Sequence, residues 1–179
     1  MKAGTKQILT VIHILAWVVF IGLCIKTGAL LYSTFVSLFI NEAAIHKLYM
    51  ELNLADLYHF DKGYYILIML LIIFLSALKA FIFYLVIKIF LKINLVHPFS
   101  KEVYKLITAI SIVGLTIGLF AISASNYTDW LIKKGVHFPA MQEYVGGGSE
   151  FIFFAGIIFF IAQVFKRGME IQTENELTV

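Results

Sequence analysis

The chain has 179 residues, of which 61% are hydrophobic and 14% are charged, with a formal net charge of +3. Water-soluble domains average about 45–50% apolar and about 25% charged residues, so the composition excludes an ordinary soluble globule. The small net charge gives no support for direct nucleic-acid binding, and the lysines suit an anionic lipid surface better.

Four stretches are apolar and long enough to be membrane spans, for which roughly 20 residues are needed. The predicted spans cover residues 8–27, 64–88, 104–125 and 150–166, and the cytosolic tail covers 167–179. They leave no length for a separate soluble domain, so we predict a single four-span membrane domain over residues 1–179. The expected fold class is an all-α membrane protein: an antiparallel bundle of four transmembrane helices with helical or irregular extracytoplasmic loops.

The first apolar run follows Lys2 and Lys6, as in a signal peptide. It continues past Lys26 without a small-residue cleavage site. We therefore interpret it as a retained membrane anchor.

The loop after the first span has an amphipathic pattern. Its apolar residues recur at helical spacing, as expected of a helix lying at the outer membrane interface: Ala44, Ile45, Leu48 and Leu52. Alternatively, the first span continues unbroken from Gln7 to Ile40 and projects beyond the membrane, with Gly28 as a place for a bend. The sequence is compatible with both arrangements.

The second span contains Lys79, about two-thirds of the way along its apolar run. A charge at the membrane centre costs around 2.5–3.5 kcal/mol on insertion scales, which makes such a residue a functional candidate. No acidic residue lies within the apolar runs to pair with it, so we expect its amine to turn toward the inner face, helped by Ser76, Gln163 or backbone carbonyls. That role would be structural, and a ligand-binding or coupling role is the alternative.

His13 and Gln163 complete the candidate intramembrane polar site, together with Lys79 and Ser76. His13 lies four residues before Trp17, so the two share a helix face. We expect His13 and Gln163 to make hydrogen bonds between helices, worth roughly 0.6 kcal/mol each. A proton relay is disfavoured because no acidic partner is present.

The third span carries a stripe of small residues, which let helix backbones approach closely. The stripe consists of Ser111, Gly114, Gly118 and Ala121. In a four-span protein we expect it to pack inside the bundle, with homodimerisation as the less favoured alternative. Ser100 is predicted to cap the N-terminus of this span.

The second long loop, residues 126–150, is expected to have an irregular backbone because it contains VHFP and three consecutive glycines. Lysine and arginine in short loops set the orientation of a membrane protein. With the N-terminus inside, the inner side holds eight of these residues and the outer side holds five. The prediction is therefore that both termini are cytosolic.

Motifs typical of enzymes and metal sites are not recognisable. The histidines outside the spans, His46, His59 and His137, lack the spacing of metal ligands on one helix. A metal site assembled across both outer loops is a weak alternative. We expect no enzymatic activity, no metal and no cofactor.

The chain ends in a segment that is acidic but closes on apolar residues. Lys166 and Arg167 mark the end of the fourth apolar run, which is short and is expected to be extended when they reach the headgroups. A purely solubilising tail has no need of Leu177 and Val179 at its end. A short segment that folds on binding a cytosolic partner would use them.

From Gly156 to Val179 the sequence resembles the C-terminal signature of a bacterial membrane family, the domain of unknown function 2975. In that signature, a basic pair and a glycine follow the last span, and an acidic, glutamine-containing stretch closes on Asn-acid-Leu-Thr-Val/Ile. The matching positions are Lys166, Arg167, Gly168, Glu170, Gln172, Glu174, Asn175, Glu176, Leu177, Thr178 and Val179. Pro98-Phe99-Ser100 also matches, and Glu176 departs from the Asp that the family tends to have.

The resemblance implies a protein of the bacterial plasma membrane with no established activity. Members of the family are often encoded beside a helix-turn-helix regulator of the Xre type, which implies a cytosolic DNA-binding partner contacted through the tail. Our hypothesis is a non-enzymatic membrane tether or sensor acting with that regulator. The alternative is a small transporter or channel subunit that works as an oligomer, with Lys79 and the stripe of the third span lining its path.

Overall fold

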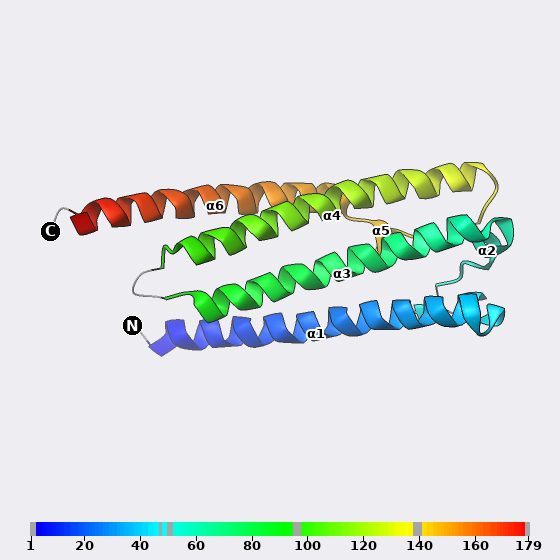
Figure 1. The fold of residues 1–179 in the computed structure, drawn as a ribbon, viewed down its shortest axis with the longest axis horizontal. Helices are drawn as coiled ribbons and strands as arrows, with labels where there is room; N and C mark the ends of the chain where they lie inside the picture. Colours follow the sequence, from blue (N-terminus) through cyan, green and yellow to red (C-terminus); the bar gives the residue numbers. More distant parts are fainter. Residues whose placement is uncertain (1–2, 47, 50–51, 95–97, 138–140, 178–179) are drawn as a thin grey trace.

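The computed structural model describes residues 3–46, 48–49, 52–94, 98–137 and 141–177. Its four long helices run antiparallel to their neighbours (Figure 1): α1 (Ala3–Phe39), α3 (Lys62–Lys92), α4 (Lys101–Lys133) and α6 (Gly148–Leu177). Three short pieces are η1 (Glu42–His46), α2 (Ala55–Phe60) and α5 (Gln142–Val145). Each long helix is long and apolar enough to cross a membrane, which confirms the predicted fold class.

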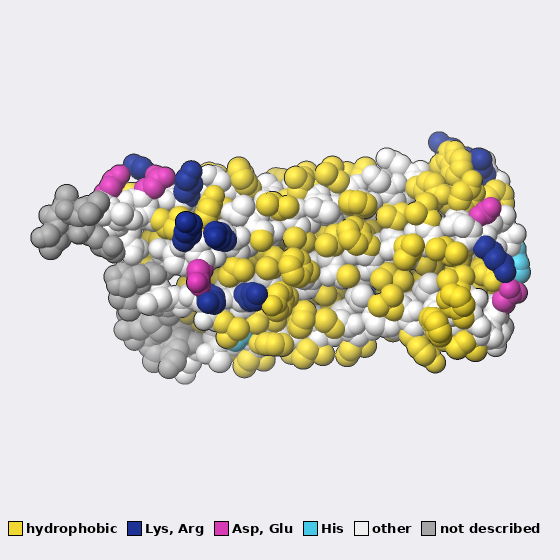
Figure 2. All heavy atoms as spheres, in the orientation of Figure 1, with side chains coloured by type: hydrophobic (Ala, Val, Ile, Leu, Met, Phe, Trp, Pro, Cys, Tyr) yellow, Lys and Arg dark blue, Asp and Glu magenta, His cyan; other side chains and the backbone are white. Residues whose placement is uncertain are grey.

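The two ends of the molecule differ in content. Both termini and the α3–α4 connection lie at one end, which we call the terminal end (Figure 1). The pieces η1 and α2 lie at the other, which we call the loop end. Figure 2 shows an apolar band between the two ends, and charged side chains gather toward each of them. Side chains such as Val18 and Phe160 are 61% and 69% exposed, as expected where lipid rather than water is the solvent.

The long helices form a row rather than a closed bundle. Helix α1 packs on α3, α3 packs on α4, and α4 packs on α6, whereas α1 and α6 share no comparable interface. Accordingly α1 and α6 are mostly exposed, and α3 and α4 carry most of the buried residues. A closed four-helix arrangement would bring α1 against α6, so this side of the molecule is left open.

Small residues allow the closest helix pair, α4 and α6, to approach. A Cβ atom at Gly118 would lie 2.5 Å from Cγ1 of Ile152 and 2.9 Å from the carbonyl oxygen of Gly148. The hydroxyl of Ser111 donates a 2.8 Å hydrogen bond to the carbonyl oxygen of Ala155. The stripe of the third span therefore packs inside its own chain, as the sequence predicted.

The contact between Gly118 and Gly148 also sets where α6 begins. Gly118 lies near the middle of α4, so the first residue of α6 lies level with the middle of that helix (Figure 1). The preceding loop returns from the loop end, and α5 contacts both α3 and α4. In this returning loop, the side chains of Met141, Tyr144 and Val145 are buried. The fourth apolar run is short because the folded loop, rather than α6, occupies the part of the molecule between the middle of α4 and the loop end.

At the loop end, the sequence left two arrangements open, and the structure shows the unbroken first helix. Helix α1 continues through Gly28 to Phe39, a length of about 55 Å at 1.5 Å per residue. The alternative of an interfacial α-helix over this loop is wrong for the part that the structure describes, which leaves out residues 47, 50 and 51. Here the chain forms the short η1, and the backbone N–H groups of Leu48 and Leu54 donate to the carbonyl oxygens of Leu52 and Ile45.

The reason for this difference is burial on the protein rather than in lipid. The side chains of Ile45, Leu48 and Leu52 are 1%, 3% and 2% exposed and belong to the main hydrophobic core. A surface helix would have left these side chains facing the acyl chains. The loop therefore closes over the end of α3.

Polar contacts fix the helix ends at both ends of the molecule. At the loop end, Glu42 accepts hydrogen bonds from the Tyr58 hydroxyl at 2.8 Å and from the Lys62 ammonium at 3.1 Å. These two contacts lower the pKa of the Glu42 carboxyl. At the terminal end, Ser100 Oγ accepts from the backbone N–H of Val103, which confirms the predicted cap of α4.

Substitution of Gly118 by alanine tests the close approach of α4 and α6. Its Cβ would meet the backbone of Gly148 and Ile152, which cannot rotate away, so we expect a loss of about 1–3 kcal/mol of stability. The measurement is thermal unfolding of the purified protein in mild detergent. Gly156→Ala is the matched control, since nothing lies within 4 Å of its Cβ position. An equal loss of stability in both variants would contradict the proposed packing.

Candidate functional site

A cavity of about 630 Å³ lies on the open side of the molecule, between α1, α3 and α6. It occupies the place where α1 and α6 would meet in a closed bundle. The residues that line it are Val19, Leu23, Lys79, Ile82, Phe83, Val86, Glu150, Phe151 and Phe154. Lys79 and Glu150 are the two charged residues of this lining, and the surface that faces the cavity is almost entirely apolar.

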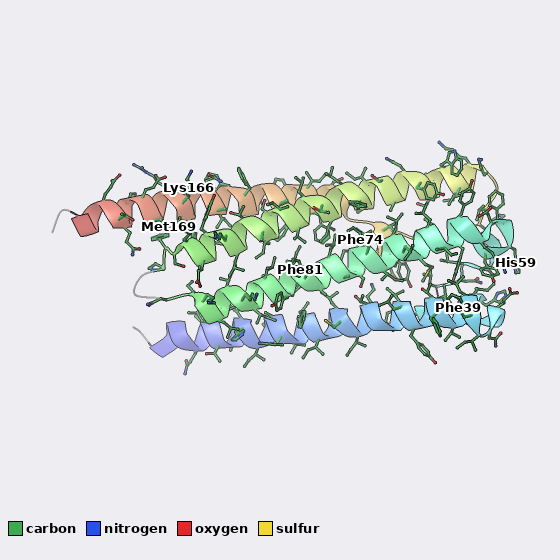
Figure 3. All side chains as sticks on the ribbon, in the orientation of Figure 1. Phe39, His59, Phe74, Phe81, Lys166 and Met169 are labelled. Carbon is green, nitrogen blue, oxygen red and sulfur yellow. The ribbon has the colours of Figure 1, made fainter. Side chains whose placement is uncertain are left out.

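The ammonium group of Lys79 lies 5.3 Å from the centre of the Phe151 ring, within the range of a cation–π interaction. Phe151 belongs to the first turns of α6 and therefore lies level with the middle of α4. At that level α4 meets α3 through the ring pair Phe120 and Phe74, which are 5.1 Å apart. Phe74 precedes Lys79 along α3, on the loop-end side, and Figure 3 shows Phe74 nearer to that end than Phe81.

We expected the amine of Lys79 to turn toward the inner face, helped by Ser76, Gln163 or backbone carbonyls. In the structure its ammonium lies over the Phe151 ring, which α6 provides. The hydroxyl of Ser76 makes a 2.8 Å hydrogen bond with that of Thr27 on α1.

Glu150 is the residue that sequence reasoning missed. It lines the same cavity as Lys79, although the sequence places no acidic residue inside an apolar run. Counting along the sequence puts Glu150 at the edge of the fourth span, whereas the returning loop starts α6 at the middle of α4 and carries Glu150 inward. The shortness of the fourth apolar run was the available signal. Among the described residues, the ion pairs do not include one between Lys79 and Glu150.

A second lysine, Lys26, lies beside the cavity. It follows Leu23, which lines the cavity, by one helical turn, so the two share a face of α1. Its ammonium lies 5.4 Å from the centre of the Tyr144 ring. The region around the cavity therefore contains Lys79 and Lys26 together with the carboxylates of Glu150 and of Glu143, which precedes Tyr144 in α5, so its formal charges balance.

The structure does not gather the four predicted members of the polar site. His13 accepts a hydrogen bond from Nε1 of Trp17 at 3.1 Å and stacks on Phe90 at 5.4 Å, near the terminal end. Gln163 lies twelve residues beyond Phe151 on α6, about 18 Å along the helix axis. The hydrogen bond of His13 lies within one helix rather than between helices. Lys79 and Ser76 alone are neighbours.

The predicted partner-binding tail is a direct continuation of α6. The helix runs past Lys166 to Leu177, and an ion pair of 2.9 Å joins Arg167 to Glu170 within it. We expected a segment that becomes ordered only on binding, and the described part is already helical because it prolongs the span. Thr178 and Val179, and the side chains of residues 175–177, lie outside the described residues.

Two separate parts of the family signature meet where the tail leaves the molecule. A Cβ atom at Gly168 would lie 2.6 Å from the Phe99 ring, so only glycine admits the ring at this distance. The Phe99 ring also packs edge-on against Phe165, with centroids 5.2 Å apart. The α3–α4 connection is thereby fixed to α6 at the start of the tail.

The histidines at the loop end do not converge on a common point. Within the part of the chain that the structure describes, no group of three or more His, Cys, Asp or Glu side chains is placed to hold a metal ion. His137 lies 3.6 Å from the carboxylate of Asp56, as an exposed pair.

Comparison with known proteins places most of the chain in one family. The model of a family described as "Protein of unknown function (DUF2975)" matches residues 49–179, which is the chain from the first loop through α6. No curated protein and no solved structure matches the chain.

Replacement of Lys79 by methionine tests whether the charge is costly to the fold. Removing an ammonium group from the interior of a span should stabilise the protein, since such a charge costs around 2.5–3.5 kcal/mol on insertion scales. We expect a higher unfolding temperature for Lys79→Met and little change for Lys88→Met. Lys88 also lies over an aromatic ring of its own helix, Tyr84, at 4.8 Å. A lower unfolding temperature for Lys79→Met would mean that the lysine stabilises the fold.

Proposed function

Because the chain belongs to the DUF2975 family of proteins of unknown function, we propose a function from its own geometry: a non-enzymatic membrane tether or sensor that acts on a cytosolic helix-turn-helix regulator. The observation that carries this proposal is the continuity of α6. One helix supplies Glu150, Phe151 and Phe154 to the cavity and extends without a break to the tail.

The chemistry of the tail suits a basic partner. Glu170, Ile171 and Glu174 are exposed, and helical spacing puts them on one side of α6. This face combines two carboxylates, one of which is paired with Arg167, with an apolar side chain that is 46% exposed. A DNA-binding protein carries a lysine- and arginine-rich surface for phosphates, so an acidic helix is complementary to it.

The position of the tail is also defined. The Phe99 ring against Gly168 and Phe165 fixes α6 to the rest of the molecule immediately before the tail. Figure 1 shows the end of α6 projecting beyond the other long helices at the terminal end. A partner could therefore reach the tail without competing with the α3–α4 connection.

We further propose that the protein lies in a bacterial plasma membrane with both termini in the cytosol. Two observations support this orientation: the termini share one end of the molecule (Figure 1), and lysine and arginine are more numerous on that side of the sequence-based topology. The acidic tail would then be accessible to a cytosolic protein.

The transporter or channel alternative ranks second. The Lys79 cavity supports a polar position inside the membrane, but the row of helices leaves α1 and α6 unpacked. A continuous path would need a second copy of the chain to close that side. The small stripe of α4 is already occupied by α6, so it is not free to line such a path.

Deletion of residues 169–179 tests the tail as the contact. We expect the truncated protein to lose a helix-turn-helix partner that co-purifies with the full chain in mild detergent, because the acidic face is removed while Gly168 and its contact with Phe99 remain. The measurement is identification of co-purified proteins by mass spectrometry.

The matched control carries the same eleven residues in reversed order, which preserves length and charge. Loss of the partner from both altered chains, with retention by the full chain, supports a sequence-specific contact. Recovery of the same proteins from all three chains would contradict the proposal.

Cysteine labelling tests the orientation. In a Cys24→Ser background, Lys133→Cys should react with a membrane-impermeant maleimide in intact cells, because Lys133 ends α4 at the loop end. Thr173→Cys should react only after the cells are opened. Labelling of Thr173→Cys in intact cells would reverse the proposed topology.

A further inference from the structure

Basic side chains gather on one broad face of the helix row near the terminal end, over α3, α4 and α6 (Figure 2). Helices α3 and α4 contribute two lysines each, one helical turn apart: Lys88, Lys92, Lys101 and Lys105. We call these four residues the basic patch, and all four are exposed. An ion pair of 3.1 Å between Lys92 and Glu102 joins the two helices within the patch.

The described charges at this end do not balance. The basic side chains of α3, α4 and α6 there are the basic patch, Lys166 and Arg167, and the acidic ones are Glu102, Glu170 and Glu174. Three positive charges are therefore in excess. Two of the three carboxylates are already paired, with Lys92 and Arg167. Among the residues that the structure describes, no ion pair involves Lys88, Lys101 or Lys105.

The ion pair between Lys92 and Glu102 also sets the level of two of these lysines. Lys88 precedes Lys92 by four residues on α3, and Lys105 follows Glu102 by three residues on α4. Because the helices are antiparallel, both steps lead toward the middle of the membrane, by about 6 Å and about 4.5 Å. Neighbouring helix axes lie about 8–10 Å apart, so the long side chains of Lys88 and Lys105 can reach one common anion.

Lys88 lies at the depth of lipid head groups. Twenty-six residues separate it from Lys62 at the loop end of α3, about 39 Å along the helix axis. The hydrocarbon core is about 30 Å thick, and the bilayer with its head groups is about 40–45 Å thick. With Lys62 at one interface, Lys88 therefore reaches the polar layer of the other.

An almost entirely apolar groove of about 450 Å³ lies between α1 and α3 and ends next to the basic patch. Its lining includes Phe20, Cys24 and Gly28 of α1 and Ala77, Phe81 and Tyr84 of α3. Tyr84 is the lining residue of α3 nearest the terminal end, and the Lys88 ammonium lies 4.8 Å from the centre of its ring. The hydroxyl of Thr27, which also lines the groove, is hydrogen-bonded to that of Ser76 at 2.8 Å.

We propose that this face binds one anionic phospholipid of the leaflet at the terminal end. Its phosphate lies between Lys88 and Lys105, and one acyl chain lies in the groove between α1 and α3. Basic pockets between transmembrane helices are suited to the head groups of anionic lipids. The groove favours a lipid over a soluble anion, because an acyl chain that continues from the phosphate covers its apolar surface.

The proposed lipid site goes beyond the proposed function and is separate from the tail contact. Lipid binding is measured on the purified protein without a cytosolic partner. Absence of lipid binding would leave the tail contact untouched, and absence of the partner would leave lipid binding untouched.

The experiment titrates the full chain, purified in a neutral detergent, with dioleoyl phosphatidylglycerol. Bound lipid is counted by native mass spectrometry. We expect one tightly retained molecule per chain, and binding of dioleoyl phosphatidylcholine that is at least about tenfold weaker. Inorganic phosphate should not displace the lipid. Equal binding of the two lipids would overturn the choice of an anionic head group, and displacement by inorganic phosphate would overturn the choice of a lipid.

Charge variants test the head-group contact. We expect Lys88→Gln combined with Lys105→Gln to weaken phosphatidylglycerol binding at least about tenfold, and Lys88→Arg combined with Lys105→Arg to retain it. The matched control is Lys133→Gln combined with Lys134→Gln, which removes the same charge at the loop end. Equal weakening by the two glutamine pairs, or by neither, would overturn the assigned position of the phosphate.

Variants of the groove test the position of the acyl chain independently. Cys24 is exposed and lines the groove, so Cys24→Trp should fill the groove and weaken phosphatidylglycerol binding. Ile25→Trp is the matched control, because Ile25 is 63% exposed and does not line the groove. Ala77→Leu fills the groove from α3 and should act as Cys24→Trp does. Native affinity in both Cys24→Trp and Ala77→Leu would overturn the placement of the chain.

Discussion

The contact between Gly118 and Gly148 is the constraint on which the rest of the structure depends. Two glycines bring the backbones of α4 and α6 together at the middle of α4, where a Cβ atom on either would collide with the other helix. In lipid there is no hydrophobic drive to join helices, so close packing of this kind carries much of the association. Because α6 starts there, Glu150 and Phe151 reach the level of Lys79, and the far end of α6 projects past the other helices.

The side of the molecule between α1 and α6 is open, because the long helices form a row rather than a closed bundle. Each of α3 and α4 packs against two other long helices, whereas α1 and α6 each pack extensively against one. A closed bundle would bury this side, whereas the row of helices leaves a largely apolar cavity there, with Lys79 among its lining residues. A charged residue inside a membrane span is a candidate functional position, because a charge is costly there.

The sequence predicts the coarse fold well because the length and hydrophobicity of membrane spans are local properties. The presence of four spanning helices, the cap at Ser100 and the packing of the small stripe are confirmed. The loops were harder to predict, because apolar residues recur at the same spacing in the sequence whether they are buried against the protein or in lipid. Ile45 and Leu48 illustrate this: their helical spacing fitted an interfacial helix, but their side chains lie in the protein core.

Sequence reasoning identified Lys79 in the candidate site, but not the residues of α6 that line the cavity with it. Lys79 can be recognised from the sequence alone, because it is a charged residue inside an apolar run. Its companions depend on how far along α4 the last helix begins, and that offset is set by a tertiary contact between two glycines. His13 and Gln163 were grouped with Lys79 because all three are polar, and the structure separates them along the helix axes.

The unbroken course of α6 has a mechanical meaning. Glu174 lies twenty-four residues after Glu150 on the same continuous helix, about 36 Å along its axis. A continuous helix resists compression, so a displacement of its first turns along the axis would be carried to the acidic face. The Phe99 ring against Gly168 holds the helix from the side just before that face.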